Sequence, residues 1–207
     1  MMKKIIINAD DYGLSSLFNK GILELATTKK ISSVSAMVTK KFSLSAIDLN
    51  NVSIGLHLKI KERDTLKEMK KQLMLFRRLF KKLPSHLDGH QHQHLTKYNL
   101  PKVIKLARKY GLPIRSRFSA DRKMLRRFKI KTPDNFISWH PKRIKDLENK
   151  LKNADGSVVE LVCHPGYYDK SFKSGYNQHR KEELKFLKSR RFKKLIDQFK
   201  IIRYDEF

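Results

Sequence analysis

The chain alternates short apolar runs with longer amphipathic segments along its 207 residues. The apolar runs are rich in β-branched residues and are bounded by turn-forming residues, a pattern that favours strands. They predict strands at residues 4–8, 31–38, 52–58, 85–88, 112–118, 136–139, 158–163 and 200–204. Strands that alternate with helices indicate an α/β fold with a mainly parallel sheet, either open or closed into a barrel of seven or eight strands.

Apolar positions at helical spacing occupy most of the intervals between these strands. They predict helices around residues 17–25, 66–83, 101–110, 146–151 and 181–199. The third shows the asymmetry typical of helix ends, since Pro101 opens it and Gly111 follows it. The basic segment 121–131 fits a solvated helix or a loop. Since no repeat, low-complexity tract or linker divides the chain, we expect a single domain over residues 1–207.

The charge of the chain is its most unusual bulk property. It has 47 Lys and Arg against 20 Asp and Glu, a formal net charge of +27. Such an excess attracts polyanions, so nucleic acid has to be considered as a ligand. However, basic residues occur in nearly every segment, lysine dominates, and no zinc-finger, homeodomain or RNA-recognition signature accompanies them. We therefore interpret the charge as a lysine-rich background and do not expect nucleic acid as the physiological ligand.

Hydropathy and cysteine content bear on location. No run of 18 apolar residues occurs, and the apolar start of the chain soon reaches Asp10 and Asp11, so neither a membrane span nor a signal peptide is predicted. The single cysteine, Cys163, cannot form an internal disulfide, which agrees with a reducing compartment. We expect a cytoplasmic protein and interpret Cys163 as a small core residue.

Candidate reactive side chains lie at the ends of four predicted strands. They are Asp10 and Asp11 after the first strand, His57 late in the third, the histidine-rich stretch 86–94 with Asp88 at the fourth, and His164 after the strand at 158–163. In parallel α/β folds the loops that follow the carboxyl ends of the strands converge. We therefore expect these side chains to share one site.

The composition of this predicted site indicates metal-assisted hydrolysis. Two imidazoles and one carboxylate suit a first-row divalent ion that keeps positions open for water. A spare aspartate could then act as a base and a spare histidine as an acid. Adjacent side chains on a strand point in opposite directions, so Asp10 and Asp11 face the same atom only if the strand has begun to turn. Which of the two binds metal stays open.

Four segments resemble, in order, the motifs of the YdjC/ChbG-type carbohydrate deacetylases. They are residues 8–13 (NADDYG), 55–58 (GLHL), 86–92 (HLDGHQH) and 164–167 (HPGY). The resemblance runs from residue 3 to about residue 187. It implies a distorted (β/α) barrel of the TIM-barrel type and an enzyme that removes acetyl groups from N-acetylated sugars with one divalent metal ion. It leaves the oligomeric state open, although members of the family often form homodimers.

The resemblance further implies roles for individual residues. Asp11, His57 and His90 would bind the metal, Asp10 would be the general base and His164 the acid. Residues 176–184 resemble a further family segment, in which Arg180 would orient the base or contact substrate. Asp88, His92 and Tyr167 would contact the substrate. For the ion, the family favours magnesium, whereas imidazole and carboxylate ligands also suit zinc, manganese, cobalt or nickel.

One departure from the family and two rival functions complete the sequence-based picture. After His57 the chain enters a helix promptly, where relatives usually carry a long loop over the sugar site, so we expect a more open cleft. A metal-dependent phosphoesterase would suit the basic charge but usually needs two ions and more carboxylates. A non-catalytic binder of polyanions on the same scaffold is the second rival.

Overall fold

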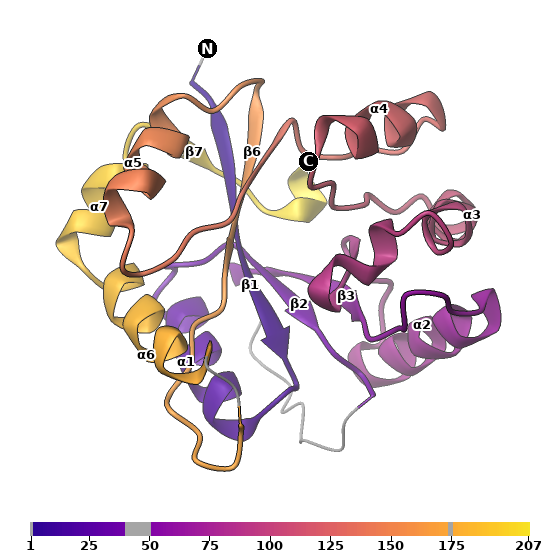
Figure 1. The fold of residues 1–207 in the computed structure, drawn as a ribbon, viewed down its shortest axis with the longest axis horizontal. Coiled ribbons are helices and arrows are strands. Elements are labelled where there is room, and N and C mark those ends of the chain that lie inside the picture. The colour runs from indigo at the N-terminus through magenta and orange to yellow at the C-terminus, as the bar shows by residue number, and fades with distance from the viewer. Residues whose placement is uncertain (1, 40–50, 174–175) are drawn as a thin grey trace.

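The computed structural model describes residues 2–39, 51–173 and 176–207, and its centre is one sheet of seven strands (Figure 1). The strands are β1 (Lys4–Tyr12), β2 (Ser33–Ala36), β3 (Ser53–Leu58), β4 (Leu87–Gly89), β5 (Asn135–Ile137), β6 (Val158–Cys163) and β7 (Lys200–Ile201). Their order is β4-β3-β2-β1-β6-β5, with β7 beside the start of β1, and every pairing is parallel. The predicted α/β fold with seven parallel strands is confirmed.

Helices cover the sheet in two groups (Figure 1). The helices are α1 (Ser16–Thr27), α2 (Leu66–Phe80), α3 (Leu100–Tyr110), α4 (Ser119–Arg127), α5 (Ile144–Lys152), α6 (Tyr176–Leu187) and α7 (Arg190–Ile196), with short 3-10 helices η2 (His90–Leu95) and η3 (Tyr204–Glu206). α2, α3 and α4 lie together on the right of the view, and α1, α5, α6 and α7 lie on the left. Within the described residues, no helix has the length and apolar character needed to span a membrane.

The two faces of the sheet differ in chemistry because side chains alternate along each strand. On β1, Ile5 and Ile7 belong to the main apolar core, whereas the intervening Ile6 packs in a separate small cluster with Val158, Ile202 and Tyr204. Farther along the Ile6 face of β1, Asn8 and Asp10 replace apolar residues and are almost fully buried. The sheet therefore carries a polar interior toward the carboxyl ends of its strands.

Two predicted elements differ in the structure. Residues 112–118 form only an isolated bridge, between Ile114 and Leu87, so among the described residues the sheet ends at β4 on one side and β5 on the other, leaving an incomplete barrel. Arg115, next to that bridge, is fully buried, and its ion pairs reach into the polar interior. The helix predicted at 181–199 is divided at Ser189, whose hydroxyl accepts a hydrogen bond from the Phe192 amide and caps α7.

Candidate active site

A bulge at the end of β1 brings both aspartates to one pocket. The register with β2 shifts between Ala9 and Tyr12, and Asp11 has a φ of 69°, in the left-handed region that residues other than glycine seldom adopt. Asp10 and Asp11 consequently both line a pocket of about 530 Å³, although they are adjacent in sequence. Such local strain is typical of functional sites.

Asp11, His57 and His90 form a candidate metal centre. Asp11 Oδ1 lies 3.4 Å from His57 Nε2 and 3.1 Å from His90 Nδ1, and one ligand atom from each residue lies within 4.8 Å of the others. The His57 Nδ1–H donates to Asp88 Oδ1 at 2.8 Å, which leaves Nε2 facing Asp11. An imidazole held in this way by a carboxylate is a common arrangement for a metal-binding histidine.

The electrostatics of this group also suit a cation. Burial lowers the pKa of His57, but Asp88, Asp10 and Asp11 outweigh it, so the pKa lies well above its usual value. For Asp11, hydrogen bonds from His57 and His90 and the charge of Arg180 likewise outweigh burial and hold the pKa well below the usual range. The carboxylates around His57 therefore favour a positive charge beside its ring, and Asp11 is ionised. The two nitrogens and one carboxylate fit a divalent transition ion.

A second group, of Asp10, His57 and Asp88, has similar spacing but is already neutralised. The Arg115 guanidinium lies between the two carboxylates, with Nη1 2.8 Å from Asp10 Oδ2 and 2.7 Å from Asp88 Oδ2. A metal ion there would have to displace a buried cation. This occupancy favours Asp11 over Asp10 as the metal ligand, the choice that sequence reasoning left open.

Asp10 instead has the surroundings of an ionised base. Arg115 donates two hydrogen bonds of 2.8 Å to its carboxylate, and the Asn8 amide donates a third at 2.7 Å. Despite burial, Arg115 keeps the pKa of Asp10 below its usual value. His164 Nε2 lies 3.8 Å from Asp10 Oδ2, and burial lowers the pKa of this imidazole, so it is largely neutral at pH 7.

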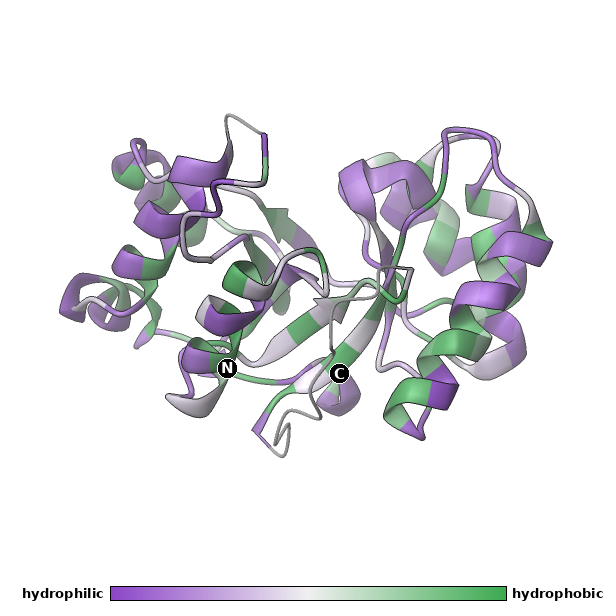
Figure 2. Cartoon of the chain, turned by 90° about the horizontal axis from the view of Figure 1, so that it is seen from below, coloured by the Kyte–Doolittle hydropathy of each residue, from purple (hydrophilic) through white to green (hydrophobic). Residues whose placement is uncertain are grey.

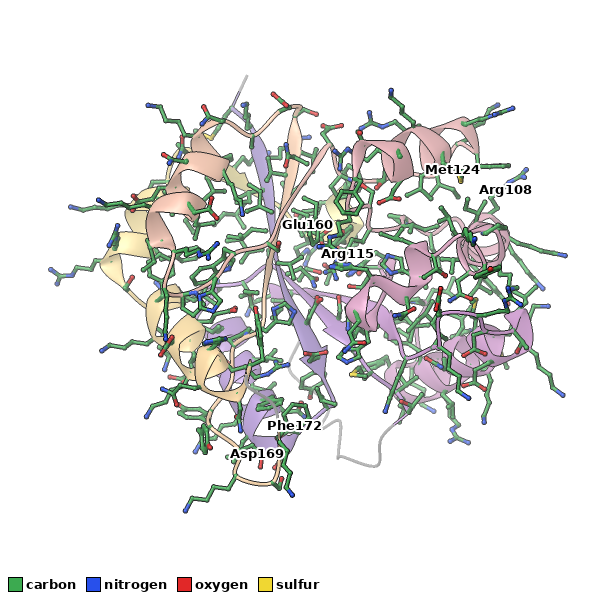
Figure 3. All side chains as sticks on the ribbon, viewed as in Figure 1. Arg108, Arg115, Met124, Glu160, Asp169 and Phe172 are labelled. Carbon is green, nitrogen blue, oxygen red and sulfur yellow. The ribbon has the colours of Figure 1, made fainter. Side chains whose placement is uncertain are left out.

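Arg115 is the principal residue that sequence reasoning missed. It is fully buried, and its guanidinium joins carboxylates from three strands, Asp10 on β1, Asp88 on β4 and Glu160 on β6. Figure 3 labels Arg115 and Glu160 near the centre of the molecule. Arg115 stands in the middle of the predicted strand 112–118, directly after Leu112, Pro113 and Ile114. A charged residue inside a predicted strand was a signal that could have identified it, but its charge was counted with the basic background.

Arg180 acts on Asp11 and not on the proposed base. Its Nη2 donates to Asp11 Oδ2, while Asp11 Oδ1 faces the two imidazoles. The guanidinium also lies over the Phe18 ring, 4.2 Å from its centroid. The structure therefore places Arg180 where it holds the Asp11 carboxylate, and Arg180 is one of the residues that line the pocket.

Of the three residues predicted to contact substrate, one lines the pocket and two do not. His92 lines the pocket, edge-on to Phe136, and burial together with Arg115 lowers its pKa to about 4. Asp88 is fully buried behind His57 and does not line the pocket. Tyr167 is also outside the lining, because its hydroxyl donates to Glu24 Oε2 at 2.7 Å. The structure thus places His92 in the pocket lining and Asp88 and Tyr167 outside it, and substrate contact by these residues stays a prediction.

Other parts of the lining come from residues that carried no motif. They include Phe136, Ser138 and Phe172, whereas Tyr176, also in the lining, begins the segment 176–184. His94, from the histidine-rich stretch, is buried away from the pocket, where its Nε2–H donates to the Arg115 carbonyl at 3.2 Å. Burial lowers the pKa of His94 to about 3, so it is a neutral structural residue.

Glu183 supports the loop that carries His164. Its Oε2 accepts a hydrogen bond of 2.6 Å from the His164 amide, and its Oε1 accepts one of 3.4 Å from the Tyr176 hydroxyl. Glu183 is fully buried, and burial raises its pKa to about 8. The side chain is therefore largely protonated in the folded protein at neutral pH and largely ionised in the unfolded chain.

This linkage predicts a pH-dependent stability. The pKa of Glu183 is raised on folding, from 4.5 to about 8, so its contribution to stability is lost as the pH rises through that interval. Glu183→Gln keeps an acceptor for the His164 amide and removes the ionisation. We expect it to raise the free energy of unfolding at pH 7 by about 2–3 kcal/mol and to have little effect at pH 4. Urea unfolding at the two pH values measures this, and an equal effect at both would contradict it.

Comparisons with known proteins agree with this geometry. The YdjC-like protein family model matches residues 4–68 and 59–198. Carbohydrate deacetylases from Enterococcus faecalis and Clostridium beijerinckii are 27% and 25% identical, with coverage of 95% and 94% of this chain and 94% and 95% of theirs. A crystal structure from E. faecalis, described as a candidate cellobiose-phosphate cleavage protein, superposes with a TM-score of 0.83 at 25% identity, covering 100% of this chain and 99% of that one.

The fold and the site define an incomplete α/β barrel with a candidate metal centre beside an ionised carboxylate and a neutral imidazole. The chain belongs to the YdjC-like family, whose model matches most of its length. The two matched segments overlap at residues 59–68, where β3 has ended and α2 begins at Leu66. This is the short connection after His57 that the sequence identified as a departure.

Proposed function

We propose that this protein is a metal-dependent hydrolase that removes acetyl groups from N-acetylated sugars. The observation that carries the proposal is the presence, in one pocket, of the Asp11–His57–His90 group and a separate acid–base pair, Asp10 and His164. Similarity to proteins named carbohydrate deacetylases supports the choice of substrate. A homodimer and a cytoplasmic location remain predictions.

Asp11, His57 and His90 would hold the ion. When bound there, a divalent ion polarises the acetyl carbonyl and lowers the pKa of water. Asp88 fixes the His57 ring, and Arg180 fixes the Asp11 carboxylate. Of the metals considered, zinc fits two imidazoles and one carboxylate better than magnesium does, because magnesium prefers oxygen ligands.

The proton transfers belong to Asp10 and His164. The ionised Asp10 Oδ2 accepts the proton of the attacking water, and the low pKa maintained by Arg115 keeps it ready to release that proton. His164 Nε2, 3.8 Å away, relays a proton to the sugar nitrogen as the carbon–nitrogen bond breaks. Because His164 is largely neutral at rest, it must receive a proton during each turnover.

Aromatic side chains give the pocket a surface for a sugar ring. Phe136, Phe172 and Tyr176 line it together with His92. Sugar rings present apolar C–H faces that pack on aromatic rings, and a few polar groups then fix orientation. His92, neutral at pH 7 because of its low pKa, exchanges hydrogen bonds with sugar hydroxyls.

The phosphoesterase alternative finds less support. Two-metal phosphoesterases need a second ion close to the first. Of the two metal-compatible groups found among the described residues, one is already bridged by Arg115. The remaining group accommodates a single ion, which favours amide hydrolysis.

Acetate release tests the proposed function. The purified protein would be incubated with N-acetylated mono- and oligosaccharides after chelator treatment and after addition of zinc, manganese, cobalt, nickel or magnesium. We expect release to fall to background with chelator and to return with one or more ions. Phosphate release from phosphorylated sugars is measured in parallel. Phosphate release without acetate release would replace this proposal with the phosphoesterase.

A further inference from the structure

The excess of positive charge is concentrated on one side of the molecule. We define the basic flank as residues 66–82, 100–111 and 119–131, which comprise α2, α3, α4 and their adjoining residues. The basic flank holds 17 Lys and Arg against two acids, Glu68 and Asp121. It therefore supplies 15 of the net 27 positive charges, and the uniform background that the sequence suggested is not what the fold produces.

The opposite group of helices has a different charge pattern. Counted over the helices alone, α2, α3 and α4 carry 13 Lys and Arg against two acids, whereas α1, α5, α6 and α7 carry 11 against five. Ion pairs join neighbouring elements there, as between Arg191 and Glu148 and between Lys188 and Glu24. Lysine-rich composition alone would charge both groups alike, so the asymmetry calls for a local cause.

Large apolar side chains are exposed on and beside the basic flank. They are Met74, Leu79, Leu83, Phe118, Met124 and Phe128, each at least 40% exposed. Between α3 and α4 there is a groove of about 790 Å³, lined by Pro101, Ile104, Lys105, Arg108, Lys109, Met124 and Phe128. Figure 3 places Arg108 and Met124 close together on this side, and Figure 2 shows hydrophobic positions interspersed with hydrophilic ones along these helices.

We infer that the basic flank docks the protein onto an anionic phospholipid membrane. Interfacial binding requires basic side chains for the headgroups and exposed Leu, Met or Phe side chains for the boundary with the acyl chains, and the flank has both. Nucleic acid would use the cations but would gain little from exposed Met74 or Leu79. The groove, lined by apolar side chains together with Lys105, Arg108 and Lys109, would receive the headgroup region.

Vesicle flotation tests this inference with the full-length protein. The probes are vesicles of phosphatidylcholine alone and vesicles with about one third phosphatidylglycerol. We expect binding only to the anionic vesicles, weakened by salt. Arg108→Glu with Lys109→Glu should reduce the partition coefficient more than about tenfold. The matched control, Lys193→Glu with Lys194→Glu on α7, makes the same charge change on exposed residues of the other group and should leave most binding intact.

A second variant isolates the apolar contribution. Met124→Gln with Phe128→Gln leaves the charge unchanged and should remove the part of the binding that resists salt. Thermal unfolding and acetate release from a soluble substrate would show that each variant is folded, since none of these residues lines the active-site pocket. Absence of binding to anionic vesicles would overturn the inference. An equal loss of vesicle binding in the α7 control would also overturn it. Binding to duplex RNA or DNA that is tighter than vesicle binding and is abolished by the same variants would do so as well.

Discussion

Asp10→Asn is expected to reduce turnover by about 10²–10⁴-fold while the protein still binds one metal ion, because the substitution removes only the proton-accepting carboxylate. The amide oxygen of asparagine still accepts from Arg115, which also retains Asp88 and Glu160 as partners. His164→Gln should behave in the same way. His57→Ala and His90→Ala should instead lose the ion, because each removes one of the three ligands. Metal content by mass spectrometry and acetate release measure the two properties separately.

A matched control comes from a histidine outside the pocket. His140 is partly exposed, and its Nδ1 accepts a hydrogen bond from the Lys142 amide. His140→Ala should preserve both metal content and turnover. Equal metal retention in the variants of Asp10, His57, His90 and His164 would contradict the division of roles. Loss of metal in Asp10→Asn alone would instead make Asp10 the ligand and Asp11 the base.

Strand ends were the informative part of the sequence. Asp10, His57 and His164 each follow or end an apolar run, and the parallel sheet brings all three into one pocket. This was predictable because the topology of parallel α/β folds places the carboxyl ends of strands together. The pairing of His57 with Asp88 also follows from strand register, since the two are neighbours on β3 and β4.

The sequence pattern could not predict the local backbone geometry. Asp11, Gln91 and His92 adopt left-handed conformations. Asp and His are enriched among the few residues other than glycine that do so, but the region is uncommon for every such residue type, so the sequence alone does not predict it here. Without the bulge at Asp11, alternation along the strand would put Asp10 and Asp11 on opposite faces. The structure therefore supplies the grounds for proposing different roles for the two aspartates, which the spacing of residues alone did not.

The motifs also did not predict how deeply each of their residues is buried in the site. Asp88 and His92 both belong to the segment HLDGHQH, but one is fully buried behind His57 and the other lines the pocket. The net charge likewise did not distinguish two kinds of basic residue. Arg115 is a buried counter-ion for carboxylates, whereas the basic flank is an exposed surface. Both distinctions depend on which side chains the fold buries, and spacing alone does not encode that.

Arg115→Met is expected to lower the free energy of unfolding by about 3–5 kcal/mol at neutral pH, because it removes the cation from a buried group of carboxylates. Asp10, Asp88 and Glu160 all pair with Arg115, and their relative exposures are 3% or less. Arg115→Lys retains the charge but cannot reproduce the planar, multiple contacts of a guanidinium, so it should show a smaller loss. The matched control, Arg117→Met, replaces an exposed arginine on the same segment and should change stability by less than about 0.5 kcal/mol.

The pH dependence of the Arg115→Met effect distinguishes lost charge from lost packing. Without Arg115, burial raises the pKa of Asp10 in the folded protein, because desolvation is then no longer outweighed by the guanidinium. A carboxyl group whose pKa is raised on folding loses its stabilising contribution as the pH rises through the interval between the unfolded and folded values. The destabilisation relative to the parent should therefore be smaller at pH 5 than at pH 8, as measured by urea unfolding. A loss that is equal at both pH values would indicate that Arg115 stabilises the fold through its packing rather than through its charge.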